Sequence, residues 1–414
     1  MRTLSTPRET PATTPNPTPA AVNPLTADRT LARVLFDVWS GDPFTLVKSP
    51  PGAGKTRLIT LLAHQLATRA GLRVVVAAQT RVQAYDVANR IHALDAPIAL
   101  LSGNQATRPH LLNPGVPFIA GARGLHTSGG VLVATTQRWI WTSTESYRAD
   151  VLLVDEAYQC TYANLAALTS MAAQVVLVGD PGQIAPVVRA DTTRWNHHAT
   201  GPHLSAPVCV ERAYPDTLST HHLTQTWRCG QATADLIAPF YPDLPFTSAR
   251  PPIALHAHDG QPLNELSRQP ITCGTEDDPR IAAAAAERVR ELLHTSIVTA
   301  TDTRPTLDTD VAVVTSHVTQ AAQIANHLSD LPGVLIGTAN SLQGAERAAT
   351  VVIHPMTGAH EVTPFNTDLG RTCVALSRHQ AHASILTTTH AEELLTTATT
   401  DAARIQRDVL AAIP

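Results

Sequence analysis

The segment Ser49–Thr56, SPPGAGKT, is the feature that most restricts how this 414-residue chain can fold. The apolar residues 44–47 before it predict a buried strand, and residues 57–70 carry apolar side chains at helical spacing. A strand, a glycine-rich loop ending in Gly-Lys-Thr and a helix form a P-loop, whose backbone N–H groups surround phosphates. Ser49 replaces the first glycine of the motif. Only two of the 30 lysine and arginine residues are lysines, so a lysine kept at Lys55 supports a phosphate-binding loop.

Length and composition limit the kind of protein that can carry this loop. The chain is long enough for two or three domains. Residues 1–28 are rich in proline and threonine without an apolar period, which predicts a disordered tail. We find no signal-peptide core and no run of about 20 apolar residues, so we expect a cytoplasmic protein without a membrane partner. Five scattered cysteines without a C-x-x-C pair argue against a zinc site or a disulfide framework.

Strand-like and helix-like segments alternate along almost the whole chain, which predicts an α/β fold with parallel sheets. We expect strands at residues 72–79, 129–137, 150–159 and 174–188 in the first half, and at 310–316, 333–346 and 349–354 in the second. Residues 96–130 predict a small irregular insertion. We place the boundary near residue 205, which gives one domain at 29–205 and a second at 206–414.

Candidate catalytic residues follow the predicted strands. Asp155 and Glu156 end an apolar strand about 100 residues after the P-loop. ATP hydrolysis needs a ligand for Mg²⁺ and a base for the attacking water, and these two acids supply both; a surface acidic pair is the alternative interpretation. Gln183 follows the next strand, where a glutamine can sense the γ-phosphate. Arg228 and Arg378 are candidate cations for the γ-phosphate, although each taken singly fits a surface arginine better.

The ordered set of motifs resembles superfamily 1 helicases of the Up-frameshift-like branch. That branch shows G-P-P-G-T-G-K-T, D-E-A-x-Q and G-D-x-x-Q-L-P-P, and this chain has SPPGAGKT, DEAYQ and GDPGQIAP. In the second half, LTQTWRC, VAVVTSHVTQ, IGTANSLQGAE and RTCVALSRH are similar to the later motifs. The resemblance covers about residues 30–390 and points to a compact bacterial or phage member. The glutamine motif that reads adenine in this family is absent upstream of the P-loop, which leaves the base preference open.

The resemblance implies two tandem RecA-like P-loop domains with parallel sheets, and ATP and Mg²⁺ as cofactors. The implied catalytic residues are Lys55, Glu156, Gln183, Arg228 and Arg378. The implied nucleotide contacts are Pro51, Gly52, Ala53, Gly54, Lys55, Thr56, Trp227 and Glu346. Thr56 and Asp155 would hold the metal. Nucleic acid would contact Thr80, Arg81, Thr135, Thr136, Ser316, Thr338 and Ser341, because hydroxyl side chains suit phosphate contacts.

We therefore expect an ATP hydrolase that is a nucleic-acid helicase or single-strand translocase, with single-stranded DNA or RNA as its partner. The resemblance implies movement in the 5′ to 3′ direction. One alternative is a P-loop NTPase that acts as a switch, or in defence or remodelling, on a protein partner without robust unwinding. Another is a nucleotide-binding scaffold with little turnover. The sequence does not separate DNA from RNA, because contacts through the backbone and by stacking tolerate both.

Overall fold

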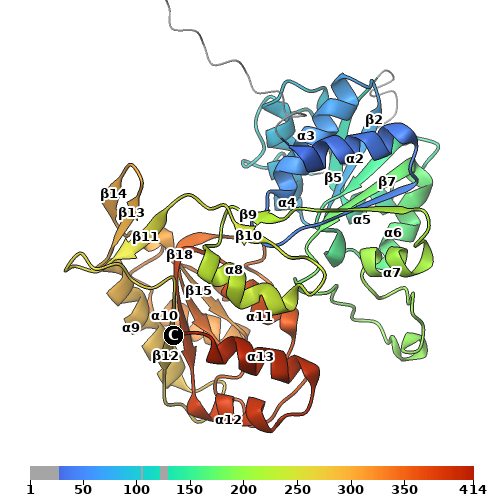
Figure 1. The fold of residues 1–414 in the computed structure, drawn as a ribbon. Helices are drawn as coiled ribbons and strands as arrows, with labels where there is room; N and C mark the ends of the chain where they lie inside the picture. The colour runs from blue at the N-terminus through green and yellow to red at the C-terminus, as the bar shows by residue number, and fades with distance from the viewer. Residues whose placement is uncertain (1–27, 104–105, 122–128) are drawn as a thin grey trace, which may run out of the picture.

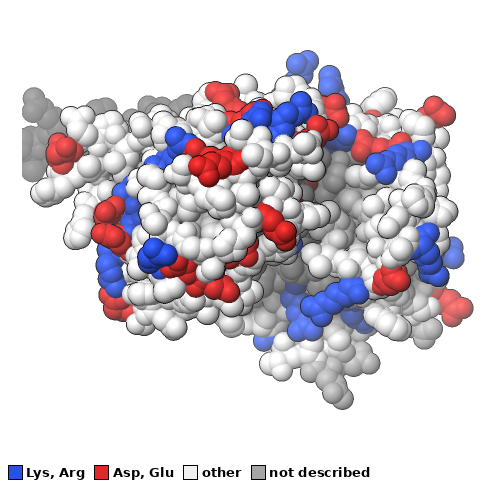
Figure 2. Space-filling model, turned by 90° about the horizontal axis from the view of Figure 1, so that it is seen from below, with Lys and Arg blue, Asp and Glu red and all other residues white. Residues whose placement is uncertain are grey.

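The computed structural model describes residues 28–103, 106–121 and 129–414. It has two lobes, each built on a parallel sheet with helices on both faces (Figure 1). The surface is hollowed between the lobes on the face that Figure 2 shows. The predicted α/β fold with two RecA-like domains is confirmed. The predicted disordered tail lies outside the described residues except for Asp28, whose side chain caps the first described helix.

The first lobe contains an eight-stranded sheet in the order β4-β3-β5-β2-β6-β7-β1-β8. All of its neighbouring strands are parallel. Its strands are β1 (Phe44–Lys48), β2 (Arg73–Ala78), β3 (Ile98–Leu101), β4 (Phe118–Ile119), β5 (Gly130–Thr135), β6 (Ala149–Val154), β7 (Ala172–Gly179) and β8 (Leu218–His222). Because the strands are parallel, their carboxyl ends meet at one edge, where ligands bind in open α/β sheets.

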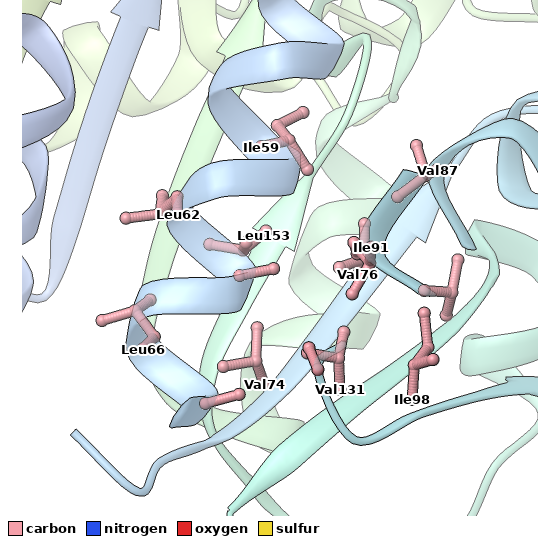
Figure 3. Close-up of a cluster of buried hydrophobic side chains, with 14 of the residues drawn as sticks. Ile59, Leu62, Leu66, Val74, Val76, Val87, Ile91, Ile98, Val131 and Leu153 are labelled. Atoms are coloured by element: carbon pink, nitrogen blue, oxygen red, sulfur yellow. The ribbon is translucent and has the colours of Figure 1, made fainter. Parts of the chain in front are cut away.

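Helices cover both faces of this sheet because its central strands are apolar on both sides. Val74 and Val76 of β2 face one core, and Val75 faces the other. The first core is covered by α2 (Arg29–Ser40), α3 (Lys55–Thr68) and α4 (Arg81–His92), as Figure 3 shows for part of it. The second core is covered by α5 (Thr136–Ile140), α6 (Tyr162–Leu168) and α7 (Ala206–Ala213). The short 3-10 helices η1 (Ala157–Gln159) and η2 (Thr169–Met171) also pack on this core. A third 3-10 helix, η3 (Thr193–Trp195), lies in the loop before α7.

Two segments of the first lobe differ from the elements that the sequence predicts. Residues 96–130, expected to be an irregular insertion, contain β3 and β4, and β3 is buried between β4 and β5. The four apolar residues of β3 are too short a run to stand out among the prolines and glycines around them. Beyond residue 205, β8 pairs with β1 and extends the first sheet to residue 222.

The second lobe contains a five-stranded parallel sheet in the order β12-β18-β17-β15-β16. Its strands are β12 (Leu266–Pro270), β15 (Val311–Thr315), β16 (Leu335–Thr338), β17 (Arg347–Ile353) and β18 (His379–Thr387). One face packs against α9 (Pro279–Leu293) and α10 (Val318–His327), and the other against α8 (Gln231–Ile237), α11 (Leu369–Leu376), α12 (Thr389–Thr397) and α13 (Asp401–Ala411). A small antiparallel sheet of β11 (Ile253–His256), β13 (Ser296–Thr299) and β14 (Thr303–Pro305) stands beside it, and the 3-10 helix η5 (Asp308–Asp310) precedes β15 (Figure 1).

The connection between the lobes begins directly after β8. It contains the two-residue strand β9 (Gln225–Thr226), which pairs with β10 (Thr247–Ser248), and continues into α8 and the 3-10 helix η4 (Ala238–Phe240). Figure 1 shows β9 and β10 where the two lobes meet. The connection therefore passes the carboxyl end of β1, where the P-loop lies.

Candidate functional site

The P-loop connects β1 to α3 and has the backbone shape that binding an anion requires. Gly52 and Gly54 have φ values of 69° and 89°, a left-handed conformation that favours glycine. Gly54 is the N-cap of α3, and no side chain bonds the first N–H groups of this helix. Lys55 is buried at the first position of the helix. The loop thus offers unpaired helix N–H groups and one cation to a phosphate.

Ser49, which stands where the P-loop motif has glycine, connects the loop to the neighbouring strand. Its backbone N–H donates to the carbonyl of Gly179 at 3.0 Å, and its hydroxyl lies 3.3 Å from the same oxygen. The serine is fully buried. The replacement therefore ties the start of the loop to the end of β7 and leaves Gly52 and Gly54 free to set its curve.

The acidic pair lies at the end of β6, beside the P-loop lysine. Asp155 is buried, and the Glu156 carboxylate is 3.5 Å from the Lys55 ammonium. Burial, together with the adjacent Glu156 charge, raises the pKa of Asp155 to about 7, against the opposing effect of Lys55. Glu156 adopts a φ of 49°, which is unusual for a residue other than glycine and typical of strain at functional sites.

Asp180, at the end of β7, is the centre of a hydrogen-bond network that joins the lobes. Its carboxylate accepts bonds from the Tyr241 hydroxyl at 2.8 Å and from the Gln183 amide at 2.7 Å. The Gln183 carbonyl oxygen in turn accepts a bond from Gln343 at 2.9 Å. Asp180 is fully buried, and burial raises its pKa. Our sequence analysis missed Asp180 and Tyr241, although Asp180 is part of the GDPGQ motif that led to Gln183.

The two candidate arginines lie together on the second-lobe side of the P-loop. The Arg228 guanidinium pairs with Glu346 at 2.6 Å and donates to the carbonyl of Ser377 at 3.3 Å. Arg378 is 1% exposed, and burial together with nearby Arg228 lowers its pKa to about 10. Among the residues that the structure describes, no carboxylate lies within ion-pair distance of Arg378. A cation buried without a counter-charge fits a site that receives an anion.

The connection between the lobes is in direct contact with the P-loop. The Thr226 hydroxyl donates to the carbonyl of Pro51 at 2.6 Å, and the Trp227 N–H donates to the carbonyl of Gly52 at 3.0 Å. A Cβ atom on Gly52 would lie 2.4 Å from that of Arg228, so this contact also requires glycine. The Trp227 side chain is 57% exposed beside the loop. The Trp227 backbone therefore lies against the P-loop with its indole exposed, and stacking of this indole on a base stays a prediction.

The four nucleic-acid candidates of the first lobe follow β2 and β5, at the same edge as the P-loop. Thr80 and Thr135 cap α4 and α5 with their hydroxyl groups, and Arg81 is exposed. Thr136 is buried, and its hydroxyl lies within 3.5 Å of the carbonyl of Ala78 and the side chain of Gln79. Thr136 therefore faces the protein interior rather than a bound strand.

The three candidates of the second lobe follow β15 and β16. The Thr338 and Ser341 hydroxyl groups lie 3.3 Å apart, and Ser316 is half-buried beside them at the end of β15. Acidic and basic side chains are mixed over the face in Figure 2, so no wholly basic surface marks a path for nucleic acid there.

The residues present fit a nucleotide with Mg²⁺. Burial and the adjacent Glu156 charge raise the pKa of the Asp155 carboxyl to about 7, so a bound cation would favour its ionised form, and carboxylates are the ligands that Mg²⁺ prefers. Thr56 directly follows Lys55 on the first turn of α3, next to the loop glycines. Phosphate would lie on the helix N-terminus, with Asp155 and Thr56 on the metal side. Among the described residues, no group of three or more His, Cys, Asp or Glu side chains forms a separate metal site.

We expect Asp155→Asn to raise the melting temperature of the nucleotide-free protein at pH 8 by about 2–4 °C. The raised pKa means that the folded protein keeps a proton that the unfolded chain releases between about pH 4 and pH 7. The free energy of unfolding of the wild type therefore falls as pH rises from about 4 to about 7. Above about pH 7 the folded wild type carries a buried ionised carboxylate, which the asparagine variant lacks. Thermal unfolding at pH 5 and pH 8 measures the effect, with the exposed Asp216→Asn as control. A variant that is less stable than the wild type at pH 8 would contradict it.

Comparison with known proteins identifies the class of the first lobe. Residues 33–232, just under half of the chain, match the family described as AAA domain. The match contains the P-loop, the acidic pair, Asp180 and Arg228. The first half of the chain is therefore similar to the AAA domain family and carries its P-loop. No curated protein matches the chain.

Several solved structures are similar to the chain at low identity. The helicase of PRRSV is 17% identical, with a TM-score of 0.46 over 86% of this chain and 55% of that one. The arterivirus nonstructural protein 10 helicase, solved in complex with DNA, is 16% identical, with a TM-score of 0.48 over 86% and 64%. The E. coli DExH-box NTPase HrpB is 13% identical, with a TM-score of 0.43 over 92% and 43%. The chain thus spans less than two thirds of the length of these proteins.

Every helix in the part of the chain that the structure describes is too short or too polar to span a bilayer.

Proposed function

We propose that this chain is an ATP-dependent helicase or single-strand translocase of superfamily 1, in the Up-frameshift-like branch. One observation carries the proposal: Arg228 comes from beyond the first sheet and lies against Gly52 of the P-loop, and its guanidinium bonds the carbonyl of Ser377, the residue before Arg378. A phosphate-binding loop on one lobe with cations from the other is the arrangement that couples ATP hydrolysis to movement between lobes. We propose two domains that meet near residue 222 rather than at the expected boundary of 205, because α7 packs on the first core and β8 is the last strand of the first sheet.

The residues of the P-loop and of the acidic pair have distinct roles in this proposal. Lys55 and the N-terminus of α3 would bind the outer phosphates, and Thr56 and Asp155 would hold Mg²⁺, which supplies positive charge to the phosphates when bound. Glu156, which follows Asp155 in the sequence and contacts Lys55, would accept the proton of the attacking water. Its carboxylate contacts Lys55 at 3.5 Å without nucleotide, so phosphate binding to Lys55 would free it to meet the water.

The second lobe supplies charge stabilisation and a signal of nucleotide state. Arg228 must leave Glu346 to reach the γ-phosphate, and Glu346 is then free to contact the ribose. Gln183 contacts both Asp180 and Gln343, so its response to the γ-phosphate reaches the second lobe directly. ATP binding would close the two lobes and hydrolysis would release them, which alternates their grip on a single strand.

Single-stranded DNA or RNA would cross the carboxyl edges of both sheets, near Thr80, Arg81 and Thr135 in the first lobe. Ser316, Thr338 and Ser341 would provide the contacts of the second lobe. Movement from 5′ to 3′ is proposed from the family resemblance.

The test is phosphate release from ATP by the full chain, alone and with oligo-dT or oligo-U, in wild type and Lys55→Ala. We expect at least 10-fold stimulation by one polymer, which weakens as salt rises because contacts to phosphates release counterions. Lys55→Ala should abolish both the basal and the stimulated rate. Arg404→Ala, an exposed arginine on α13, is the control for loss of a basic side chain.

Two results would overturn the proposal in different ways. Turnover that depends on Lys55 but ignores both polymers would favour the alternative, a nucleotide switch that acts on a protein partner. Equal rates in wild type and Lys55→Ala would remove the ATPase assignment itself.

A further inference from the structure

A pocket in the first lobe lies outside the nucleotide site. It has a volume of about 540 Å³, within the range of roughly 300–1,000 Å³ that is usual for ligand pockets. It opens at the carboxyl ends of β3 and β5, between the first turns of α4 and α5. In the sheet order, β7, β6 and β2 separate β5 from β1. At about 4.8 Å per strand, the pocket is about 19 Å from the P-loop strand.

The walls of this pocket are aromatic and basic. Trp141 stands at its mouth with 83% of its surface exposed, and Tyr85 and Phe118 contribute half-buried rings. Arg81 and Arg138 complete the walls. None of the described residues that line the pocket is acidic. The exposed tryptophan therefore shares the pocket wall with two arginines, in a chain with a net charge of −4.

The arginine in the wall is held in a fixed position. The Arg138 guanidinium donates to the carbonyls of Ser102 at 2.7 Å and Ala120 at 3.0 Å, and to the Thr142 hydroxyl at 3.0 Å. None of these partners is a carboxylate, so they hold its charge without neutralising it. Arg81 is exposed on the first turn of α4, whose N-terminus adds positive potential.

We propose that this pocket binds a nucleobase of the single strand, stacked on Trp141, with the flanking phosphates on Arg81 and Arg138. The inference rests on the proposed function and adds a base contact to a path otherwise made of backbone contacts. An indole face offers stacking to any base, and the positive charge without acidic neighbours complements the phosphates on either side. Because stacking does not depend on the sugar, the pocket would accept DNA and RNA alike.

The pocket is also connected to the acidic pair by hydrogen bonds. Thr136, next to the wall residue Thr135, has its hydroxyl 3.3 Å from the Gln79 side chain. The Gln79 amide donates to the backbone carbonyl of Asp155 at 3.1 Å. A base held against α5 would thus act on the segment that positions Asp155, which gives a physical route for stimulation of hydrolysis by the polymer.

The test compares the binding of 12-nucleotide oligo-dT, oligo-U and an abasic strand of the same length by fluorescence anisotropy. We expect wild type to bind the strands with bases more tightly than the abasic strand. Trp141→Ala should weaken binding to oligo-dT and oligo-U by about 5- to 150-fold, the range for one base stacked on an aromatic side chain. It should leave abasic binding unchanged, and Trp141→Phe should restore most of the preference for bases.

Trp39→Ala is the matched control, because Trp39 is also exposed, at 75%, but lies on α2 away from the pocket. We expect it to bind every strand as wild type does. Wild-type preference for bases that persists unchanged in Trp141→Ala would overturn this inference and leave the proposed function intact. Failure of wild type to bind any strand would instead overturn the proposed function, and the inference with it. A loss of affinity of similar size for oligo-dT and oligo-U in Trp141→Ala would support the pocket, because stacking does not depend on the sugar.

Discussion

Glutamine in place of Glu156 is expected to lower the rate of ATP turnover by about 10²–10⁴-fold, the usual contribution of a general base. The substitution keeps the size of the side chain but removes its ability to accept a proton from water. Glu156 is suited to this role because it lies beside the buried Asp155 and 3.5 Å from Lys55. Single-turnover phosphate release measures the loss, and titration with a fluorescent ATP analogue should show that binding is kept.

Glu145→Gln is the matched control, since Glu145 is an exposed glutamate of the same lobe. Its rate should equal that of the wild type. If Glu156→Gln retained more than about a third of wild-type turnover, Glu156 would not be the base.

Methionine in place of Arg378 is expected to reduce turnover by about 10³–10⁵-fold, which is the contribution measured for an arginine that stabilises charge on a transferred phosphoryl group. The same change should leave the melting temperature of the nucleotide-free protein almost unchanged, because the lost hydrogen bonds to the Val374 and Ala345 carbonyls and the Ser377 hydroxyl are offset by the loss of a buried charge that has no counter-charge. Arg378 is buried, its pKa is lowered to about 10, and Arg228 adds repulsion, so the charge is unfavourable until an anion arrives. Methionine fills a similar volume without that charge.

Steady-state turnover and thermal unfolding measure the two halves of this prediction on the same preparation. Arg404→Met, on the exposed face of α13, should change neither quantity. A drop of many degrees in melting temperature for Arg378→Met would assign Arg378 to structure rather than to the phosphate.

Much of the first lobe could be predicted because its strands are continuous apolar runs. The segment before the P-loop and the run that ends in Asp155 are buried strands in the structure, as expected. Gly52 and Gly54 of the motif adopt left-handed backbone conformations, and their contact with a nucleotide stays a prediction. These features are local, so neighbouring residues are enough to define them.

The features that the sequence did not predict depend on contacts between distant residues. Tyr241 and Asp180 are 61 positions apart, and their hydrogen bond exists only because η4 packs against the end of β7. Trp141 follows a short helix with no motif around it, and its position at a pocket depends on β3, which was itself hidden in a Pro/Gly-rich segment. Burial of the Thr136 hydroxyl likewise could not be read from a run of threonines.

The path of the connection between the lobes has a mechanical consequence. β8 runs beside β1 as far as Lys48, Leu223 then bonds the Lys48 carbonyl, and Thr226 and Trp227 bond the loop at Pro51 and Gly52. The start of the linker is therefore hydrogen-bonded to β1 and to the P-loop at successive residues, which makes the connection between them stiff. A small change in the shape of the loop must displace the linker by a similar amount. The second lobe would then rotate about a short, stiff connection. The size of its movement would depend on how far the P-loop changes shape when nucleotide binds or leaves.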